Sequence, residues 1–121
     1  MKTKSIIILL ATIILLTSAC SFQESTEKLA IGKYVMQDAI DEEWAWVLLD
    51  NDNRFEFNRN IATSYRPMGT YSVENNELIL KVNDNEVYRF EIKENSLIFI
   101  SGEYAENLIE IGTVFELAKN K

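Results

Sequence analysis

The chain has 121 residues, of which 12 are basic and 19 acidic, giving a formal net charge of −7; it contains no histidine and one cysteine. The lack of histidine excludes catalytic and metal sites that depend on imidazole, and a single cysteine excludes an internal disulfide. The acidic balance argues against nucleic-acid binding, which needs a basic surface.

The N-terminus has the pattern of a secretory signal peptide. Lys2 and Lys4 precede an uncharged apolar run over residues 6–16. A basic start followed by roughly 7 to 15 apolar residues is typical of such signals. A membrane-spanning helix needs about 20 apolar residues, so the run is short for that role. Small residues at 17–19 suit a cleavage site, and Cys20 follows directly.

Within the segment LLTSAC, Leu16 to Cys20 resemble the lipobox of bacterial lipoproteins. The family usually has Leu, Val or Ile where this chain has Thr17. The resemblance implies that residues 1–19 are a signal peptide and that Cys20 receives a diacylglycerol and becomes the first mature residue. The protein would then be lipid-anchored on the extracytoplasmic face of the cell membrane. Ordinary secretion with a free cysteine is the alternative.

The mature chain is expected to hold one domain. Cleavage before Cys20 leaves 102 residues with 10 basic and 19 acidic side chains, a net charge of −9. This length suffices for one hydrophobic core. We expect a lipidated N-terminus and tether at 20–30, the domain at 31–118 and a tail at 119–121. The high negative charge disfavours self-association, so a monomer is expected.

Period-two alternation of apolar and polar residues dominates the domain and predicts strands with one buried face. Clusters of Asn and Asp at 50–53, 74–76, 83–85 and 93–95 separate the runs and favour tight turns. Regular spacing predicts an all-β fold, an eight-stranded antiparallel meander barrel. The expected strands are 32–37, 43–50, 54–58, 69–74, 77–82, 87–93, 96–101 and 113–118.

The order GKY, RFEF, SYRPMGTY, ELIL and YRFEI over residues 31–117 resembles the small lipocalin-like β-barrel domains of Gram-positive lipoproteins. Similar domains occur at the outer end of some β-lactam-sensor-type regulators. The match is sharpest at Tyr65 and at 67–71. The resemblance implies the barrel fold and an extracytoplasmic location, and it carries no catalytic residues.

The residues predict neither an enzyme nor a cofactor or metal site. The acidic side chains are spread over loops and strand exteriors, where solvation leaves them ordinary surface carboxylates rather than catalytic pairs. DNDNRFEFNRNI begins like a calcium loop, but Arg54, Phe55 and Ile61 stand where an oxygen ligand, Gly and Glu are needed. A hairpin turn is the better interpretation.

Trp44 and Trp46 are the first pair of candidate binding residues. At i and i+2 on a strand, both rings lie on one face. They would be core residues or a cavity wall if that face points inward, and a partner contact if it points outward. The sequence does not decide which face they occupy.

Tyr65 and Arg66 are the second pair, in the long connection SYRPM. Arg66 is one of few cations on an acidic domain and could clamp a carboxylate of a ligand. The alternative is a structural corner, in which Tyr65 packs and Arg66 pairs with a nearby acid.

Two functions remain open. The first is a non-catalytic protein-binding module, such as an inhibitor, an immunity factor or an accessory subunit, with an envelope or extracellular protein as partner. The second is a binder of a small apolar or amphipathic molecule inside the barrel. An eight-stranded barrel is only just wide enough for its own side chains, and bulky inward residues favour the first function.

Overall fold

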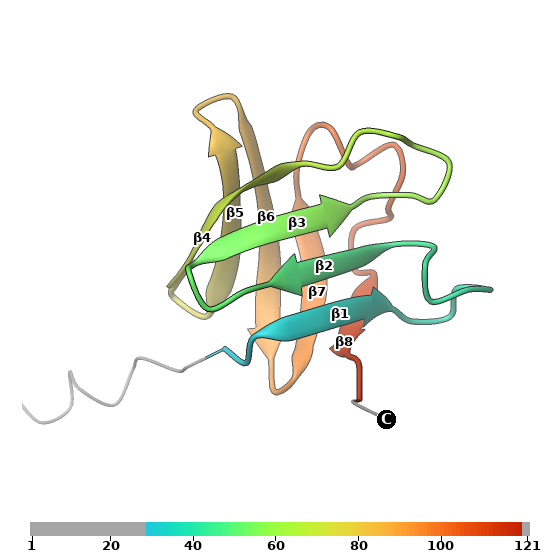
Figure 1. The fold of residues 1–121 in the computed structure, drawn as a ribbon, viewed down its shortest axis with the longest axis horizontal. Helices are drawn as coiled ribbons and strands as arrows, with labels where there is room; N and C mark the ends of the chain where they lie inside the picture. Colours follow the sequence, from blue (N-terminus) through green and yellow to red (C-terminus); the bar gives the residue numbers. More distant parts are fainter. Residues whose placement is uncertain (1–28, 120–121) are drawn as a thin grey trace, which may run out of the picture.

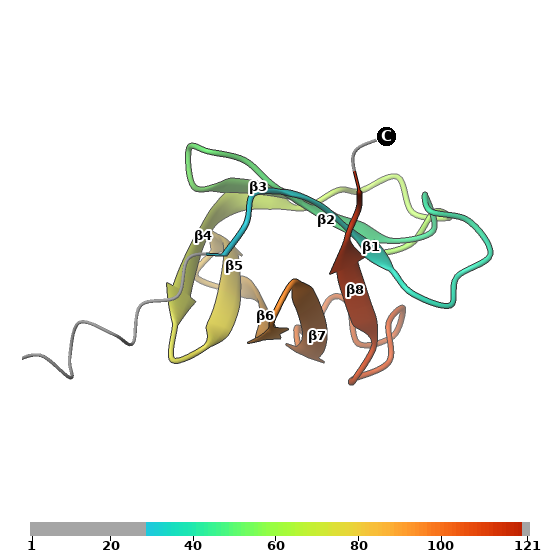
Figure 2. The ribbon, with the colours of Figure 1, turned by 90° about the horizontal axis from the view of Figure 1, so that it is seen from below.

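The chain folds into a closed barrel of eight antiparallel strands, which confirms the fold expected from the alternating pattern. A computed structural model describes residues 29–119. Each strand pairs with the next, and the last pairs with the first, so the sheet closes on itself (Figures 1 and 2). The strands are β1 (Gly32–Met36), β2 (Trp46–Leu49), β3 (Arg54–Asn58), β4 (Met68–Glu74), β5 (Glu77–Asn83), β6 (Glu86–Lys93), β7 (Ser96–Ser101) and β8 (Val114–Leu117).

Several N-terminal predictions fall outside the described residues. These are the signal peptide at 1–19, the lipidated Cys20 and the tether up to residue 28. The described part begins at Leu29, whose side chain packs against the core. The hydroxyl of Tyr34 donates a 2.6 Å hydrogen bond to the carbonyl of Ala30. The chain therefore contacts the barrel before the first strand begins.

Asparagines close the short hairpins, as the sequence predicts. Asn75 and Asn76 both have positive φ, 50° and 64°, as a two-residue turn between twisted strands requires. Asn53 takes the same left-handed conformation at the end of its turn, with φ of 57°. Glu94 also adopts this conformation, with φ of 58°, although it costs glutamate more free energy than asparagine.

The connections divide unevenly between the two ends of the barrel. Those at the end where the chain enters have two to four residues, whereas three of the four at the other end have nine to twelve. Figure 1 shows the long connections at the right and upper right. Because eight is even, β8 finishes at the end where β1 begins. We define the turn end by connections 50–53, 75–76 and 94–95, and the loop end by connections 37–45, 59–67, 84–85 and 102–113.

Bulky side chains fill the interior. The ring of Phe57 is fully buried and contacts the rings of Tyr88, Phe90 and Phe115 edge to face, with centroids 5.0, 5.7 and 6.5 Å apart. Phe90 continues the stack to Phe99 at 5.5 Å. Such pairs add about 0.5–1.5 kcal/mol each beyond the burial of their area. The buried apolar cluster comprises Tyr34, Ala45, Val47, Leu49, Phe55, Phe57, Leu78, Leu80, Tyr88, Phe90, Ile92, Leu97, Phe99, Ala105, Ile109 and Phe115.

Close backbone approach fixes one corner of the barrel. A Cβ atom added to Gly69 on β4 would overlap the backbone oxygen of Lys81 on β5. The neighbouring oxygen belongs to the backbone and cannot swing away as a flexible side chain would. Glycine at this position therefore allows the two strands to pack as closely as they do.

Candidate functional site

The four predicted binding residues lie at or beside the loop end. Trp44 is in connection 37–45, Trp46 begins β2, and Tyr65 and Arg66 are in connection 59–67. The structure brings Trp46 and Arg66 together, whereas Trp44 and Tyr65 lie in separate environments. Trp44 is half-buried and packs against the core.

Trp46 faces outward, and its neighbours along the chain explain why. Ala45 and Val47, on the opposite face, are fully buried in the interior, where Val47 pairs with Phe57. The interior beside β2 is already occupied by the Phe57 ring, so the smaller side chains point inward. The outward tryptophan is nevertheless only 6% exposed.

Charged side chains cover the outward Trp46 ring. The Lys33 ammonium and the Arg66 guanidinium lie 5.0 and 5.3 Å from its ring centroid, within cation–π range. Its indole Nε1 donates a 3.1 Å hydrogen bond to Glu43. Arg66 also lies 3.6 Å from a carboxylate oxygen of Glu56. This arrangement agrees with the structural-corner interpretation of Arg66, in which it pairs with a nearby acid.

Glu43 links Trp46 to β1. The Lys33 ammonium donates a 2.6 Å hydrogen bond to Glu43, and this bond lowers the pKa of the carboxyl. The backbone carbonyl of the same residue accepts a 2.9 Å hydrogen bond from the buried Asn58 amide on β3. Connection 37–45 is therefore held to β1 and β3.

Tyr65 contributes to a second, more buried polar cluster. Glu86, the first residue of β6, is 9% exposed, and its carboxylate accepts hydrogen bonds from Tyr65 at 3.0 Å and Tyr88 at 2.5 Å. Burial, followed by the bond to this carboxylate, raises the pKa of both phenols. Both tyrosines therefore remain neutral donors at physiological pH.

Arg59 ties this cluster to connection 102–113. Its guanidinium is buried, lies 5.1 Å from the Tyr65 ring centroid, and donates a 2.7 Å hydrogen bond to the Tyr104 carbonyl. Its Nε is buried and finds no hydrogen-bond partner within residues 29–119. Two of the long connections are thus joined by a buried cation.

Exposed apolar side chains gather on the same three connections. Ile40 is 96% exposed and Ile111 67%, and Ile61, Tyr65 and Tyr104 are each about half exposed. Connections 37–45, 59–67 and 102–113 carry these five residues. The first is hydrogen-bonded to β3, and the other two are hydrogen-bonded to each other. Exposed apolar groups on positioned loops are typical of binding surfaces.

Comparisons with known proteins do not identify this chain. No protein-family model, no curated protein and no solved structure gives a significant match. The function is therefore inferred from the geometry of the loop end.

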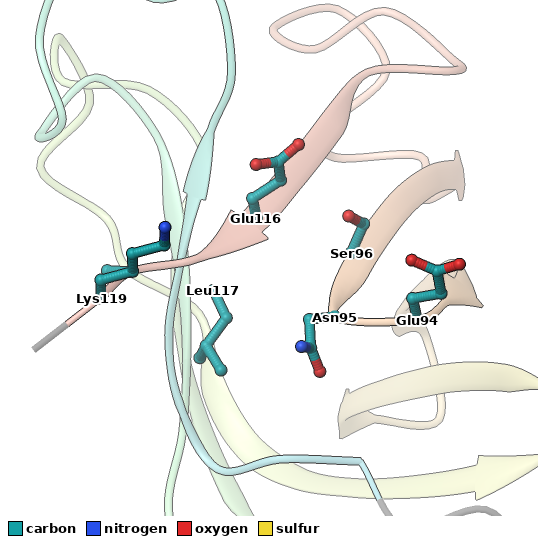
Figure 3. A pocket seen from close by; sticks show the side chains of 7 residues that line it. Glu94, Asn95, Ser96, Glu116, Leu117 and Lys119 are labelled. Carbon is teal, nitrogen blue, oxygen red and sulfur yellow. The ribbon is translucent and has the colours of Figure 1, made fainter.

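Two open hollows flank β8, away from the predicted residues. One, of about 600 Å³, lies between β8 and the turn at 94–95 (Figure 3). The other, of about 850 Å³, lies between β8 and connection 37–45. Glu94, Glu116 and Lys119, which line the first hollow, are exposed and do not converge on one point.

Residues 29–119 contain no group of three or more acidic, cysteine or histidine side chains placed to hold a metal ion. In the same stretch, the structure has no helix with the length and apolar character needed to span a membrane.

Glu86 and Arg59 are buried charged residues that were not predicted from the sequence. Charged residues are rarely buried unless paired, and acidic side chains in general were expected on loops and strand exteriors. A signal for Glu86 was present, because it stands two residues before Tyr88 on a strand that alternates inward and outward. The partners of Arg59 come from connections far apart in the chain, so no local pattern indicates them.

Proposed function

We propose that this chain is a membrane-anchored extracytoplasmic lipoprotein whose barrel is a non-catalytic protein-binding module. The loop end is its contact surface. The observation that carries this proposal is the gathering of exposed Ile and Tyr side chains on three long connections at one end. Large exposed apolar side chains, especially aromatic ones, contribute most of the free energy of binding at protein interfaces.

The polar clusters beneath these residues support the proposal. Tyr65 is held by Glu86, and the Tyr104 backbone is held by Arg59. A surface that is ordered before binding loses less conformational entropy on association. The loop end therefore offers an aromatic side chain, Tyr65, and a backbone segment, at Tyr104, that are already restrained before binding.

The interior gives less support to the alternative, a small apolar ligand bound inside the barrel. The rings of Phe57, Tyr88, Phe90, Phe99 and Phe115 occupy the space between the two sides of the sheet. A ligand would have to displace several of them. Binding on the outside needs no such rearrangement.

The direction of the chain determines how an anchor at Cys20 would orient the barrel. The described part enters the barrel at the turn end, where Leu29 packs against the core. A lipid on Cys20 would thus hold the turn end toward the membrane. The loop end would face away from the lipid, where a monomeric domain could reach an envelope or extracellular protein as an inhibitor, immunity factor or accessory subunit.

Site-specific photo-crosslinking in the producing cells tests the contact surface. A benzophenone amino acid replaces Ile61 or Ile111 at the loop end, and Ile31, which is exposed at the turn end, is the matched control. We expect protein-sized adducts from the two loop-end positions and weaker ones from the control. Adducts confined to Ile31, or none from either loop-end position, would contradict the proposal.

Cell fractionation tests the anchor. Cys20→Ser should release the protein from the membrane fraction into the medium, because the lipid is attached through the thiol. If both forms stay in the membrane with an uncleaved signal, the lipoprotein proposal is wrong.

A further inference from the structure

The loop end is strongly acidic as well as apolar. Its four connections contain eight acidic residues and two arginines, a net charge of −6. All eight acids are exposed. They are Asp38, Asp41, Glu42, Glu43, Asp84, Glu103, Glu106 and Glu110.

The two arginines present little positive charge to an approaching molecule. Arg59 is buried under connection 102–113. Arg66 is exposed, but its guanidinium lies against the Trp46 ring and beside the Glu56 carboxylate. A molecule approaching the loop end therefore meets mainly carboxylates.

Acidic residues stand next to exposed apolar ones in connections 37–45 and 102–113. Glu103 directly precedes Tyr104, and Glu110 directly precedes Ile111. Ile40 is followed by Asp41. Each of these exposed apolar groups thus has a carboxylate next to it in the chain, so a partner that covers the apolar groups must also meet the negative charges.

We infer that the partner of the loop end is a protein with a basic surface, on which Lys or Arg side chains surround apolar ones. This inference rests on the proposed function and adds the chemistry of the partner. Opposite charge around an apolar contact raises the association rate and excludes acidic competitors. An acidic partner, or an anionic lipid surface, would be repelled by the same carboxylates.

The steric and electrostatic parts of the contact have separate roles. The Ile and Tyr side chains lose water on contact and supply most of the affinity. The carboxylates act mainly on encounter, so their contribution falls as salt shortens the range of charge interactions to about 8 Å at physiological ionic strength. Binding at the loop end should therefore weaken as salt is raised.

A charge-neutralised pair of variants tests the inference. Glu42→Gln, Glu103→Gln and Glu110→Gln are combined, because none of these side chains makes a hydrogen bond or ion pair within the described residues. The control combines Glu74→Gln, Glu91→Gln and Glu116→Gln, three exposed strand positions outside the loop end. Both triples change the net charge by the same amount.

The probe is a synthetic amphipathic peptide of leucine and lysine. The full chain is held in phosphatidylcholine nanodiscs on a biosensor, with empty nanodiscs as the reference. We expect the loop-end triple to weaken binding about tenfold and the control triple less than about twofold, because surface charges act most strongly within a Debye length. A leucine–glutamate peptide should not bind.

Three results would overturn the inference. These are an equal loss of binding in both triples, no loss in either, and binding of the leucine–glutamate peptide as tight as that of the leucine–lysine peptide. Ile61→Ser, which leaves every charge in place, should also weaken peptide binding if the apolar groups take part. If crosslinking at Ile61 and Ile111 captures a partner in cells but the loop-end triple keeps it, the proposed function stands and the basic partner is excluded.

Discussion

Replacing Phe57 by alanine tests whether the barrel interior is filled. The ring is fully buried and contacts three other rings, with centroids 5.0 to 6.5 Å away. Phe→Ala in a core costs about 3–5 kcal/mol, from lost transfer free energy and from the cavity left behind. A domain of this size is stable by about 5–14 kcal/mol, so the substitution removes a large part of the total.

Urea unfolding followed by far-ultraviolet circular dichroism measures this loss. Phe57→Leu is the milder companion, and we expect it to cost about 1–2 kcal/mol because most of the volume is kept while the ring contacts are lost. Leu48→Ala, on the outer face of β2, is the control and should cost about 1 kcal/mol or less. A loss below about 1 kcal/mol for Phe57→Ala would refute the tightly packed interior.

Benzene extends the same experiment to function. Apolar cavities of suitable size stay dry and bind benzene. We expect benzene to raise the urea midpoint of Phe57→Ala and to leave that of the wild-type protein unchanged. A wild-type midpoint that rises equally would mean that the interior already has room, and it would favour the small-ligand alternative.

Three further predictions concern the backbone and the buried phenols. Gly69→Ala should cost about 2–3 kcal/mol of stability because its Cβ overlaps the backbone of the next strand. Gly112→Ala, at φ of 96° with open space around it, should cost only about 1 kcal/mol of conformational strain. Thermal unfolding compares the two variants, and equal losses of stability would remove the steric explanation. Glu94→Gly should raise stability by about 0.5–1 kcal/mol in urea, since glycine adopts positive φ freely, and a loss would show that the Glu94 side chain makes a stabilising interaction. Burial raises the pKa of Tyr34 to about 12, and the pKa of Tyr88 is also raised, so the unfolded state ionises first as the pH increases. The stability that these two phenols contribute is complete below about pH 10 and is lost as the pH rises through their folded pKa values. Tyrosinate absorbance should show that the two phenols ionise as the protein unfolds. Ionisation of all tyrosines near pH 10 in the folded protein would contradict their burial.

The sequence predicted most strands well because their residues alternate between an apolar and a polar face. YRFEIK alternates strictly, and β6 (Glu86–Lys93) buries Tyr88, Phe90 and Ile92 in that order. The Asn and Asp clusters located the hairpins because asparagine adopts positive φ at low cost. These signals are local, so they survive without knowledge of the tertiary structure.

The facing of β2 could not be predicted, because both of its faces are apolar. The choice depends on Phe57 across the sheet, which leaves room for Ala45 and Val47 and sends Trp46 outward. The cations that then cover the Trp46 ring come from connection 59–67 and from β1. Which face of β2 is buried therefore depends on the volumes of side chains that come into contact only in the folded barrel.

The candidate residues were partly separated by the fold for the same reason. Tyr65 and Arg66 are adjacent in sequence, yet Tyr65 bonds to Glu86 while Arg66 lies against Trp46. In a strand, adjacent side chains point to opposite faces, whereas in an irregular connection their directions follow no such pattern. The lipidation of Cys20 and the binding roles of Trp44, Trp46, Tyr65 and Arg66 remain predictions for the experiments above.

The even number of strands has a practical consequence for engineering. Because β1 begins and β8 ends at the turn end, a fluorescent protein or affinity tag fused at the C-terminus would be carried on the side opposite the loop end. Foreign sequences grafted into 37–45, 59–67 or 102–113 would then be displayed together on the free side. The barrel would serve as a scaffold whose display side and attachment side are separated by the length of its strands.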